Sequence, residues 1–312
     1  MSRFFWYQIV LPKFIKNNNY DYMINMTNYG PIFPGCKQIL LLHNPKHVSQ
    51  EIKNSFNKKN KIKLKFQDFI LKLSLIGADN LVVQTNYMKE GVIKKFNFPK
   101  EKIYVIPNSP PTIKRDNIDK TLEKQILDFI GDEQNVLSNI TLYSKHKNLE
   151  TLFEAINYIK ENRLCKLKLI ITIDESENED AKSLISLIDK YELQEYILSV
   201  GNIKHENIHQ ILSKSKVFVF PSYAETLGIP FIEAMKFNLP IIASDLGFAH
   251  DVCGDSAIYF EYNNVKDLAF KINNLLSDNN MIEKLKVKSK EREKLYSEDL
   301  TVKSYLNLLN KN

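Results

Sequence analysis

The stretch from Val217 to Phe260 constrains the fold of this chain more than any other part of its sequence. It opens with four apolar residues that stop at Pro221, a pattern typical of a buried strand that enters a loop. Pro230 then stands where proline is favoured, just ahead of a helical pattern of apolar residues. Residues 241–243 form a second apolar run after that helix. The stretch therefore predicts a strand, a loop, a helix and a strand in succession.

Two carboxylates stand out in this stretch, Glu225 in the loop and Glu233 inside the helix. A carboxylate near a helix start is often only a capping or solvated residue. Here the free backbone N–H groups of a helix N-terminus favour a phosphate, and Gly228 lets the backbone approach a ligand closely. The carboxylates can then accept hydrogen bonds from sugar or ribose hydroxyls while the backbone holds a diphosphate.

The run PSYAETLGIPFIEAM, with Glu225 and Glu233 eight residues apart, resembles the E-x7-E signature of the family 4 glycosyltransferases. These are retaining enzymes of the GT-B fold that use nucleotide-sugar donors. The continuation LPIIASDLGFAHDVCGDSAIYF is also similar to that family, and a weaker resemblance extends over nearly the whole chain. The resemblance implies two Rossmann-like doubly wound domains and says little about the substrate.

Length and composition agree with a two-domain globular protein. The chain has 312 residues, 44% of them hydrophobic and 26% charged. Its three cysteines are too few and too scattered for a disulfide framework or a metal site, which favours a reducing, cytoplasmic compartment. The net charge of +6 comes largely from lysine. That charge indicates either a solvated Lys-rich surface or attraction to anionic lipid or a polyanionic acceptor, and without a recognition motif it does not favour nucleic acid.

The apolar start of the chain, residues 4–11, is too short to span a bilayer and has no secretory cleavage site. No other apolar run approaches the length of a spanning helix. We therefore expect a soluble or peripherally attached protein, in the cytoplasm or at the inner face of the membrane.

Strand and helix patterns alternate along the chain, which favours a parallel, doubly wound sheet. The expected strands are 20–26, 38–42, 80–84, 103–106, 136–143, 167–173, 197–200, 217–220 and 241–243. The expected helices are 2–15 (bent or ended at Pro12), 61–77, 86–96, 122–130, 149–161, 181–191, 205–215, 265–276, 281–294 and 300–310, besides the one after Pro230.

This order predicts an N-terminal, acceptor-side domain over residues 1–112 and a nucleotide-sugar-binding domain over residues 113–280. A proline-bearing linker is expected over residues 109–120, and helices over residues 281–312 are expected to pack back on the N-terminal domain. Members of the resembled family begin with a strand and a Gly-rich turn that have no counterpart here, so the N-terminal domain is expected to be shortened.

His43 follows the expected strand 38–42, at the edge of a parallel sheet where ligands gather. A lone histidine is more often structural or solvated. The resemblance implies a catalytic role, because the family places a histidine at the corresponding strand end, facing the reacting sugars.

Lys145 and Lys147 lie between a strand and a helix start, a position suited to a diphosphate. Lys147 matches a lysine of the family motif, whereas the family's arginine has no clear counterpart and Lys145 is its expected substitute. The alternative is that both are surface lysines in a loop.

By resemblance, Lys147 neutralises the leaving diphosphate, Glu225 holds hydroxyls of the transferred sugar and Glu233 accepts from the ribose. The remaining expected donor-binding residues are Lys145, Gly201, Thr226, Leu227, Gly228 and Ile229. The resemblance thus implies a retaining, metal-independent hexosyltransferase with a UDP- or GDP-linked sugar donor and no other cofactor. Its acceptor is expected to be a glycan or lipid-linked glycan, used in surface polysaccharide or lipopolysaccharide synthesis.

Two other classes remain open at this stage. The missing N-terminal units are compatible with a catalytically weak or inactive GT-B subunit that binds a nucleotide sugar or a partner protein. A sugar-nucleotide epimerase or a phosphorylase is the second alternative. The E-x7-E loop argues against both, and the sequence presents no pyridoxal phosphate lysine for a phosphorylase.

Overall fold

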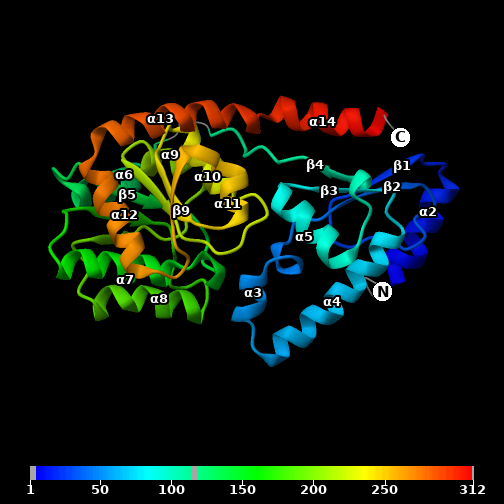
Figure 1. Ribbon diagram of the computed structural model, residues 1–312, viewed down its shortest axis with the longest axis horizontal. Helices are drawn as coiled ribbons and strands as arrows, with labels where there is room; N and C mark the ends of the chain where they lie inside the picture. Colours follow the sequence, from blue (N-terminus) through cyan, green and yellow to red (C-terminus); the bar gives the residue numbers. More distant parts are fainter. Residues whose placement is uncertain (1–4, 114–117, 311–312) are drawn as a thin grey trace. The chain divides into compact units, whose positions relative to one another are not determined.

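The computed structural model describes residues 5–113 and 118–310, and the chain divides into two compact units (Figure 1). The first unit comprises Met1–Asn108, Ala224–Leu227 and Thr301–Asn312, and the second comprises Ser109–Tyr223 and Gly228–Leu300. Each unit contains one parallel β-sheet with helices packed on it, which confirms the predicted α/β class.

The sheet of the first unit has four parallel strands in sequential order. They are β1 (Tyr22–Asn25), β2 (Lys37–Leu41), β3 (Asn80–Val83) and β4 (Ile103–Val105). The helices of this unit are α2 (Leu11–Asn17), α3 (Gln50–Ser55), α4 (Lys58–Ile76), α5 (Asn86–Phe96) and, from Thr301 onward, α14 (Glu298–Asn310).

Alternate residues of β2 and β3 face opposite sides of this sheet, as the two-residue repeat of a strand requires. Leu40 and Leu81 pack in one core cluster with residues of α4 and α5. Ile39 and Val82 belong to the other cluster, which includes Leu308 of α14. The central strands β2 and β3 are therefore covered on both faces by apolar contacts, as in other parallel sheets.

The second unit holds six parallel strands in the order β10-β9-β8-β5-β6-β7. They are β5 (Val136–Asn139), β6 (Lys168–Ile171), β7 (Ile197–Ser199), β8 (Val217–Phe220), β9 (Ile241–Ser244) and β10 (Ala257–Phe260). The helices are α6 (Lys120–Ile130), α7 (Leu149–Glu161), α8 (Glu179–Lys190), α9 (Ile208–Leu212), α10 (Ile229–Lys236), α11 (Gly247–Cys253), α12 (Val265–Ser277) and α13 (Asn279–Glu293).

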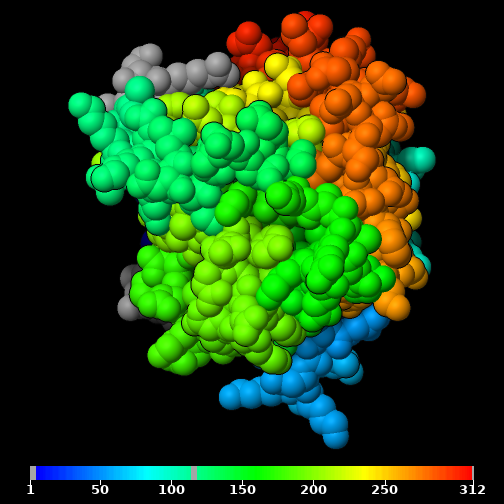
Figure 2. Space-filling model, turned by 90° about the vertical axis from the view of Figure 1, so that its left-hand side faces the viewer, coloured from blue at the N-terminus to red at the C-terminus, as the bar shows by residue number. Residues whose placement is uncertain are grey.

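The side chains of β8 show how this sheet is buried on both faces. Val217 and Val219 belong to the core cluster formed with α7, α8 and α12. Phe220 points the other way and meets Phe231 of α10 edge-on, with ring centroids 4.9 Å apart. Figure 1 shows α7, α8 and α12 on one face of the sheet and α6, α9, α10 and α11 on the other. In Figure 2, α12 and α13 (orange) lie alongside the green surface of α7 and α8.

Many helices begin where the sequence supplies a side chain that accepts a hydrogen bond from the first turn. Such caps are Ser49, Asn57, Thr85, Asp119, Asn178, Asn264 and Asp278. None of the helices in the described ranges combines the length and the apolar content that crossing a bilayer requires.

Several boundaries differ from the sequence expectations. A π-helical turn, Trp6–Val10, precedes α2, and the helix runs on through Pro12 to Asn17. The wider turn accommodates the proline ring and its missing N–H, so Pro12 does not end the helix. Residues 2–4 of the expected helix 2–15 and residues 114–117 of the expected linker lie outside the described residues.

Three further differences concern the second unit. The expected strand 136–143 stops at Asn139, because the next four residues leave the ladder and line a pocket. The expected helix 205–215 is a 3₁₀ turn followed by the short helix α9. Residues 281–300, which were expected to pack on the N-terminal domain, belong to the second unit, where α13 contacts α10 and α12.

A buried ionic cluster joins three helical segments of the first unit. His47, in the 3₁₀ turn after β2, is fully buried, and its Nδ1 lies 2.8 Å from Asp68 Oδ1 on α4. Lys95 of α5 donates to the other carboxylate oxygen of Asp68 and, at 2.7 Å, to the carbonyl oxygen of His47. Tyr29 Oη lies 3.2 Å from Nε2 of the same imidazole.

Burial lowers the pKa of His47, although the hydrogen bond and charge of Asp68 oppose that shift. Burial alone would raise the pKa of Asp68, but hydrogen bonds from His47 and Lys95 hold it below its ordinary value. Both groups are therefore harder to protonate in the folded state than in the unfolded chain, so acid must destabilise the first unit.

We predict that the first unit loses stability as the pH falls below about 6.5, where a histidine of the unfolded chain begins to bind a proton. A second loss follows below about pH 4, where Asp68 is protonated. Each group contributes a slope of at most about 1.4 kcal/mol per pH unit. Urea unfolding followed by fluorescence measures this unit selectively, because Trp6 is the only tryptophan of the chain.

The His47→Gln variant should flatten the dependence between pH 6.5 and pH 5, since it removes the titrating group. His250→Gln, which changes a half-exposed histidine of the second unit, is the matched control and should leave the Trp6 profile unchanged. An equally steep profile in His47→Gln would contradict this assignment.

Candidate functional site

The strand order of the second unit reverses between β5 and β8. The chain runs outward from β5 through β6 to β7, then returns to the other side of β5 and continues through β9 to β10. In open parallel sheets, ligands bind outside the carboxyl ends of the strands at such a reversal. A pocket of about 650 Å³ opens at this place, lined by Ile140–Tyr143 directly after β5 and by Thr172 directly after β6.

Hydrogen bonds fix the strand ends that form the floor of this pocket. Asn139, the last residue of β5, donates from Nδ2 to the carbonyl oxygen of Val219 on β8 at 2.8 Å. Thr141 and Thr172 exchange two hydrogen bonds of 3.0 Å, so the segments after β5 and β6 are held together. The segments that line the pocket are therefore held in position by hydrogen bonds at the ends of the strands.

The loop that carries Lys147 is attached to the end of β8. Residues Lys145–Lys147 form a 3₁₀ turn, and Asn148, in the left-handed region at φ 56°, leads directly into α7. The carbonyl oxygen of His146 accepts hydrogen bonds from Ser222 Oγ at 3.0 Å and from the Tyr223 backbone N–H at 2.8 Å. This attachment places Lys147 in the pocket lining, with Nζ 5.1 Å from the centroid of the Phe220 ring.

The N-terminus of α10 forms another wall. Gly228 precedes the helix at φ 75°, a conformation that favours glycine, and Ile229 and Pro230 line the pocket. The backbone N–H of Ile229 and the positive end of the helix border the same space as the ammonium of Lys147, whereas Pro230 has no N–H and that of Phe231 donates to the Gly228 carbonyl oxygen at 2.9 Å. Together they form an environment suited to an anion such as a diphosphate.

Glu233 lies one turn further along α10 and also lines the pocket, although it is only 5% exposed. Its Oε1 accepts a hydrogen bond from His205 Nε2 at 2.6 Å. His205 lines the pocket too, from the 3₁₀ turn that begins the segment after β7. The pair presents a carboxylate of fixed orientation beside the anion-binding space.

His205 was missed by the sequence reasoning, which treated it only as the start of a helix. Asn202 and Ile203, just before it, also line the pocket. The signal for His205 was available in the topology, because it follows a strand of the sheet at its carboxyl end. The contact with Glu233, 28 positions away in sequence, could not be read from spacing.

The other predicted donor-binding residues of this unit lie around the pocket. Lys145 lines a separate hollow with Tyr143, Ser144 and the start of α8. Gly201 immediately precedes the lining residues Asn202 and Ile203 and has φ 70°. Lys147, Ile229 and Glu233 thus share one pocket, whereas Lys145 does not line it.

The remaining predicted site residues belong to the first unit. His43 follows β2 and is exposed, with its backbone N–H donating to Asn28 Oδ1 at 2.9 Å. Partial burial lowers the pKa of its imidazole, which favours the neutral form at neutral pH. Glu225, Thr226 and Leu227 lie in the segment assigned to this unit, where the carbonyl oxygen of Thr226 accepts from Thr85 Oγ1 at 3.0 Å.

Within residues 5–113 and 118–310, no three histidine, cysteine or acidic side chains are grouped so that they could hold a metal ion. Positive charge in the pocket comes from the ammonium of Lys147 and from the partial charge at the N-terminus of α10. Catalysis without a metal stays a prediction.

Comparison with proteins of known structure supports the fold. A glycosyltransferase from Rickettsia africae matches with a TM-score of 0.74 at 18% identity, over 97% of this chain and 79% of its own. The Anabaena protein Alr3699/HepE, solved in complex with UDP-glucose, matches with a TM-score of 0.74 at 16% identity, over 99% of this chain and 84% of its own. The predicted GT-B fold is thereby confirmed.

Sequence comparison points the same way. The O-antigen chain mannosyltransferase RfbU of Salmonella typhimurium is 26% identical over 237 residues, which cover 76% of this chain. Those residues are 62% of RfbU, so the chain spans less than two thirds of that relative. The family model of the glycosyl transferases group 1 matches residues 120–292, which contain the whole pocket. Because the match covers more than half of the chain, this protein belongs to the glycosyl transferases group 1 family.

Proposed function

We propose that this protein is a retaining hexosyltransferase that moves a sugar from a nucleotide-sugar donor to a glycan or lipid-linked acceptor. The observation that carries the proposal is the second-unit pocket, in which Lys147, the start of α10 and the His205–Glu233 pair border one space. A cation and the positive end of a helix suit a diphosphate, and a fixed carboxylate suits vicinal hydroxyls. A nucleoside diphosphate carries both features on one molecule.

In this proposal the diphosphate lies against Lys147 and the first turn of α10, and Glu233 accepts hydrogen bonds from the ribose. Ile203 and Ile208, which line the pocket near His205, provide apolar surface for the base. Glu225 holds hydroxyls of the transferred sugar, and Lys145 adds positive charge near the phosphates. A catalytic role is proposed for His43, whose lowered pKa favours the neutral imidazole at neutral pH.

The proposed reaction breaks the bond between the anomeric carbon and the diphosphate oxygen and forms a bond to the acceptor hydroxyl oxygen. The acceptor proton passes to the departing phosphate on the same face of the sugar, which preserves the anomeric configuration. Negative charge grows on the leaving group, so Lys147 and the N-terminus of α10 stabilise the transition state more than the ground state. The same groups would replace a metal ion in that role.

The relatives support the choice of donor and setting. RfbU is an O-antigen mannosyltransferase, and Alr3699/HepE was solved with UDP-glucose. We therefore propose a UDP- or GDP-linked hexose as donor and surface polysaccharide synthesis, at the cytoplasmic side of the membrane, as the setting. Nucleotide binding without turnover would instead favour the inactive-subunit alternative.

We predict that Lys147→Ala and Glu225→Ala each lower the rate of sugar transfer at least about 100-fold, as expected for loss of a group that binds charge or hydroxyls in the transition state. Transfer is measured by release of the nucleoside diphosphate in the presence of acceptor. Lys166→Ala and Glu195→Ala remove exposed charges of the second unit and serve as matched controls with unchanged rates. Wild-type turnover in Lys147→Ala, in a variant that melts like the parent, would refute the assignment.

His205 is predicted to act by orienting Glu233 toward the ribose. His205→Ala should weaken binding of the nucleoside diphosphate by roughly 10- to 150-fold, which corresponds to the loss of one hydrogen bond to a charged group. Isothermal titration calorimetry with the same nucleotide lacking its 2′ and 3′ hydroxyls separates orientation from packing. The variant and the parent should bind that analogue equally, whereas a merely structural role for His205 would weaken both ligands alike.

A further inference from the structure

Helix α4 of the first unit exposes a line of large apolar side chains. Ile62, Phe66, Phe69 and Ile76 recur at the spacing that places residues on one side of a helix. Their exposed fractions are 69%, 63%, 57% and 67%, respectively. We call these four residues the α4 strip.

The strip is not the face by which α4 packs on its own unit. Leu71 and Leu75 pack with residues of the sheet in one core cluster, and Leu64 is also buried. All three lie about half a turn around the helix from the strip. Packing of the first unit therefore accounts for one apolar face of α4 and leaves the second unexplained.

Lysines flank the strip on both sides. Successive residues of an α-helix are rotated by about 100°. This rotation places Lys59 and Lys63 on one side of the strip, and Lys61, Lys65 and Lys72 on the other side. All five are exposed.

The only acidic residue of α4 is Asp68, which forms an ion pair with Lys95 and a hydrogen bond with His47 within the fold. The exposed surface of the helix is thus apolar along its middle and cationic along both margins.

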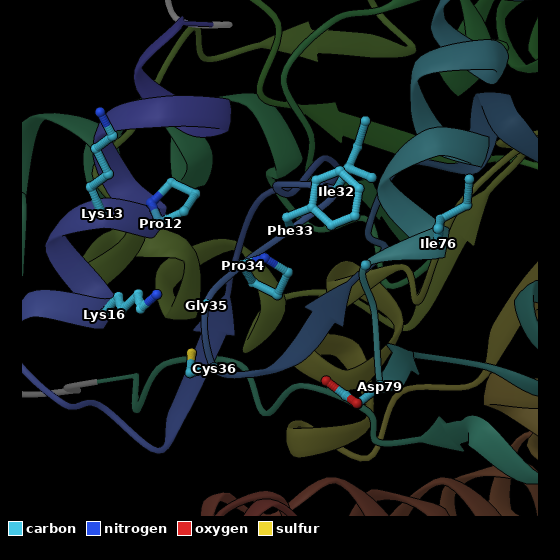
Figure 3. Close-up of a pocket in the computed structure, with 11 residues that line it drawn as sticks. Pro12, Lys13, Lys16, Ile32, Phe33, Pro34, Gly35, Cys36, Ile76 and Asp79 are labelled. Carbon is cyan, nitrogen blue, oxygen red and sulfur yellow. The ribbon is translucent and has the colours of Figure 1, made fainter.

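The strip ends at a second cationic rim. Ile76 lines a pocket of about 580 Å³ together with Phe33, which is 81% exposed. Figure 3 shows Lys13 and Lys16 of α2 on one side of this pocket and Ile76 of α4 on the other. The acid in the lining, Asp79, accepts a hydrogen bond from the Gln38 backbone N–H at 2.8 Å.

We propose that the α4 strip and the adjoining pocket rim lie on the surface of a membrane that contains anionic lipids. Apolar side chains in the middle enter the boundary between headgroups and acyl chains, and the flanking lysines reach lipid phosphates while their stems remain on the apolar surface. A protein partner would have to present acidic side chains along two parallel lines, whereas an anionic lipid surface does so everywhere. The proposal concerns the first unit and does not depend on sugar transfer by the second.

The first experiment is co-sedimentation of the full chain with vesicles of phosphatidylcholine alone and of phosphatidylcholine with phosphatidylglycerol in equal amounts. We expect binding to the mixed vesicles and much weaker binding to the neutral ones. Lys63→Gln with Lys72→Gln should lower the partition coefficient roughly 30-fold, from about 1 kcal/mol per lysine near an anionic surface. Lys284→Gln with Lys290→Gln, two exposed lysines of α13, is the matched control and should have a far smaller effect.

The apolar contribution is tested in the same way. Phe66→Ser with Phe69→Ser should lower partitioning more than tenfold, because two exposed aromatic side chains no longer enter the lipid. Phe270→Ser with Val287→Ser removes exposed apolar side chains of the second unit and should change little. Unchanged binding by the Phe66/Phe69 variant would overturn the proposal.

Insertion is read directly by fluorescence quenching. In a Trp6→Phe background, Phe69→Trp should be quenched by phosphatidylcholine brominated near the headgroup end of its acyl chains, in mixed vesicles, whereas Phe270→Trp should not be. Absence of quenching at position 69 would contradict insertion. Self-association that is lost in the Phe66→Ser, Phe69→Ser variant, without binding to vesicles, would show that the strip joins two copies of the chain and would also overturn the proposal.

Discussion

The pairing of β5 with β8 is the constraint on which the site depends. It brings Leu137 opposite Val217 and so joins two segments that are 80 positions apart in the sequence. The Lys147 loop follows one of these strands and the loop into α10 follows the other. The Ser222 hydroxyl and the Tyr223 backbone N–H both donate to the carbonyl oxygen of His146, and these hydrogen bonds attach the Lys147 loop to the segment after β8. Lys147 and the start of α10 therefore border the same pocket. The chemistry of the pocket is therefore a consequence of strand order.

Much of this arrangement could be predicted from local sequence, because the relevant patterns are short and strong. The helix 86–96 and the strand 217–220 have the predicted boundaries, since Thr85 caps the first and Pro221 ends the second. Resemblance to a known family indicated the fold and the region of the pocket. The contact between His205 and Glu233 could not be predicted, because it depends on how α10 and the segment after β7 meet in space.

Helix α4 shows the opposite limit. Its pattern predicted a helix over 61–77, but apolar residues recur on two sides of it, so the sequence could not say which side is buried. The structure resolves this, since Leu71 and Leu75 pack with the sheet in one core cluster, Leu64 is buried as well, and the α4 strip is exposed. The one negative charge of α4, on Asp68, is paired with Lys95 and hydrogen-bonded to the buried His47. The exposed lysines of α4 are thus one place where the positive charge of the chain is concentrated.

If the second-unit pocket binds a nucleotide sugar, the melting temperature of the chain must depend on that ligand. A ligand that binds only the folded protein raises the melting temperature according to its affinity and concentration. We expect a clear rise with UDP- or GDP-sugars, and a smaller one in the Glu233→Gln variant, because a neutral amide oxygen accepts hydrogen bonds from the ribose more weakly than a carboxylate does. Since Trp6 lies in the first unit, the rise must appear in a probe of the whole chain, such as calorimetry. An unchanged melting temperature with every nucleotide sugar, in a folded sample, would contradict binding of a nucleotide sugar in this pocket.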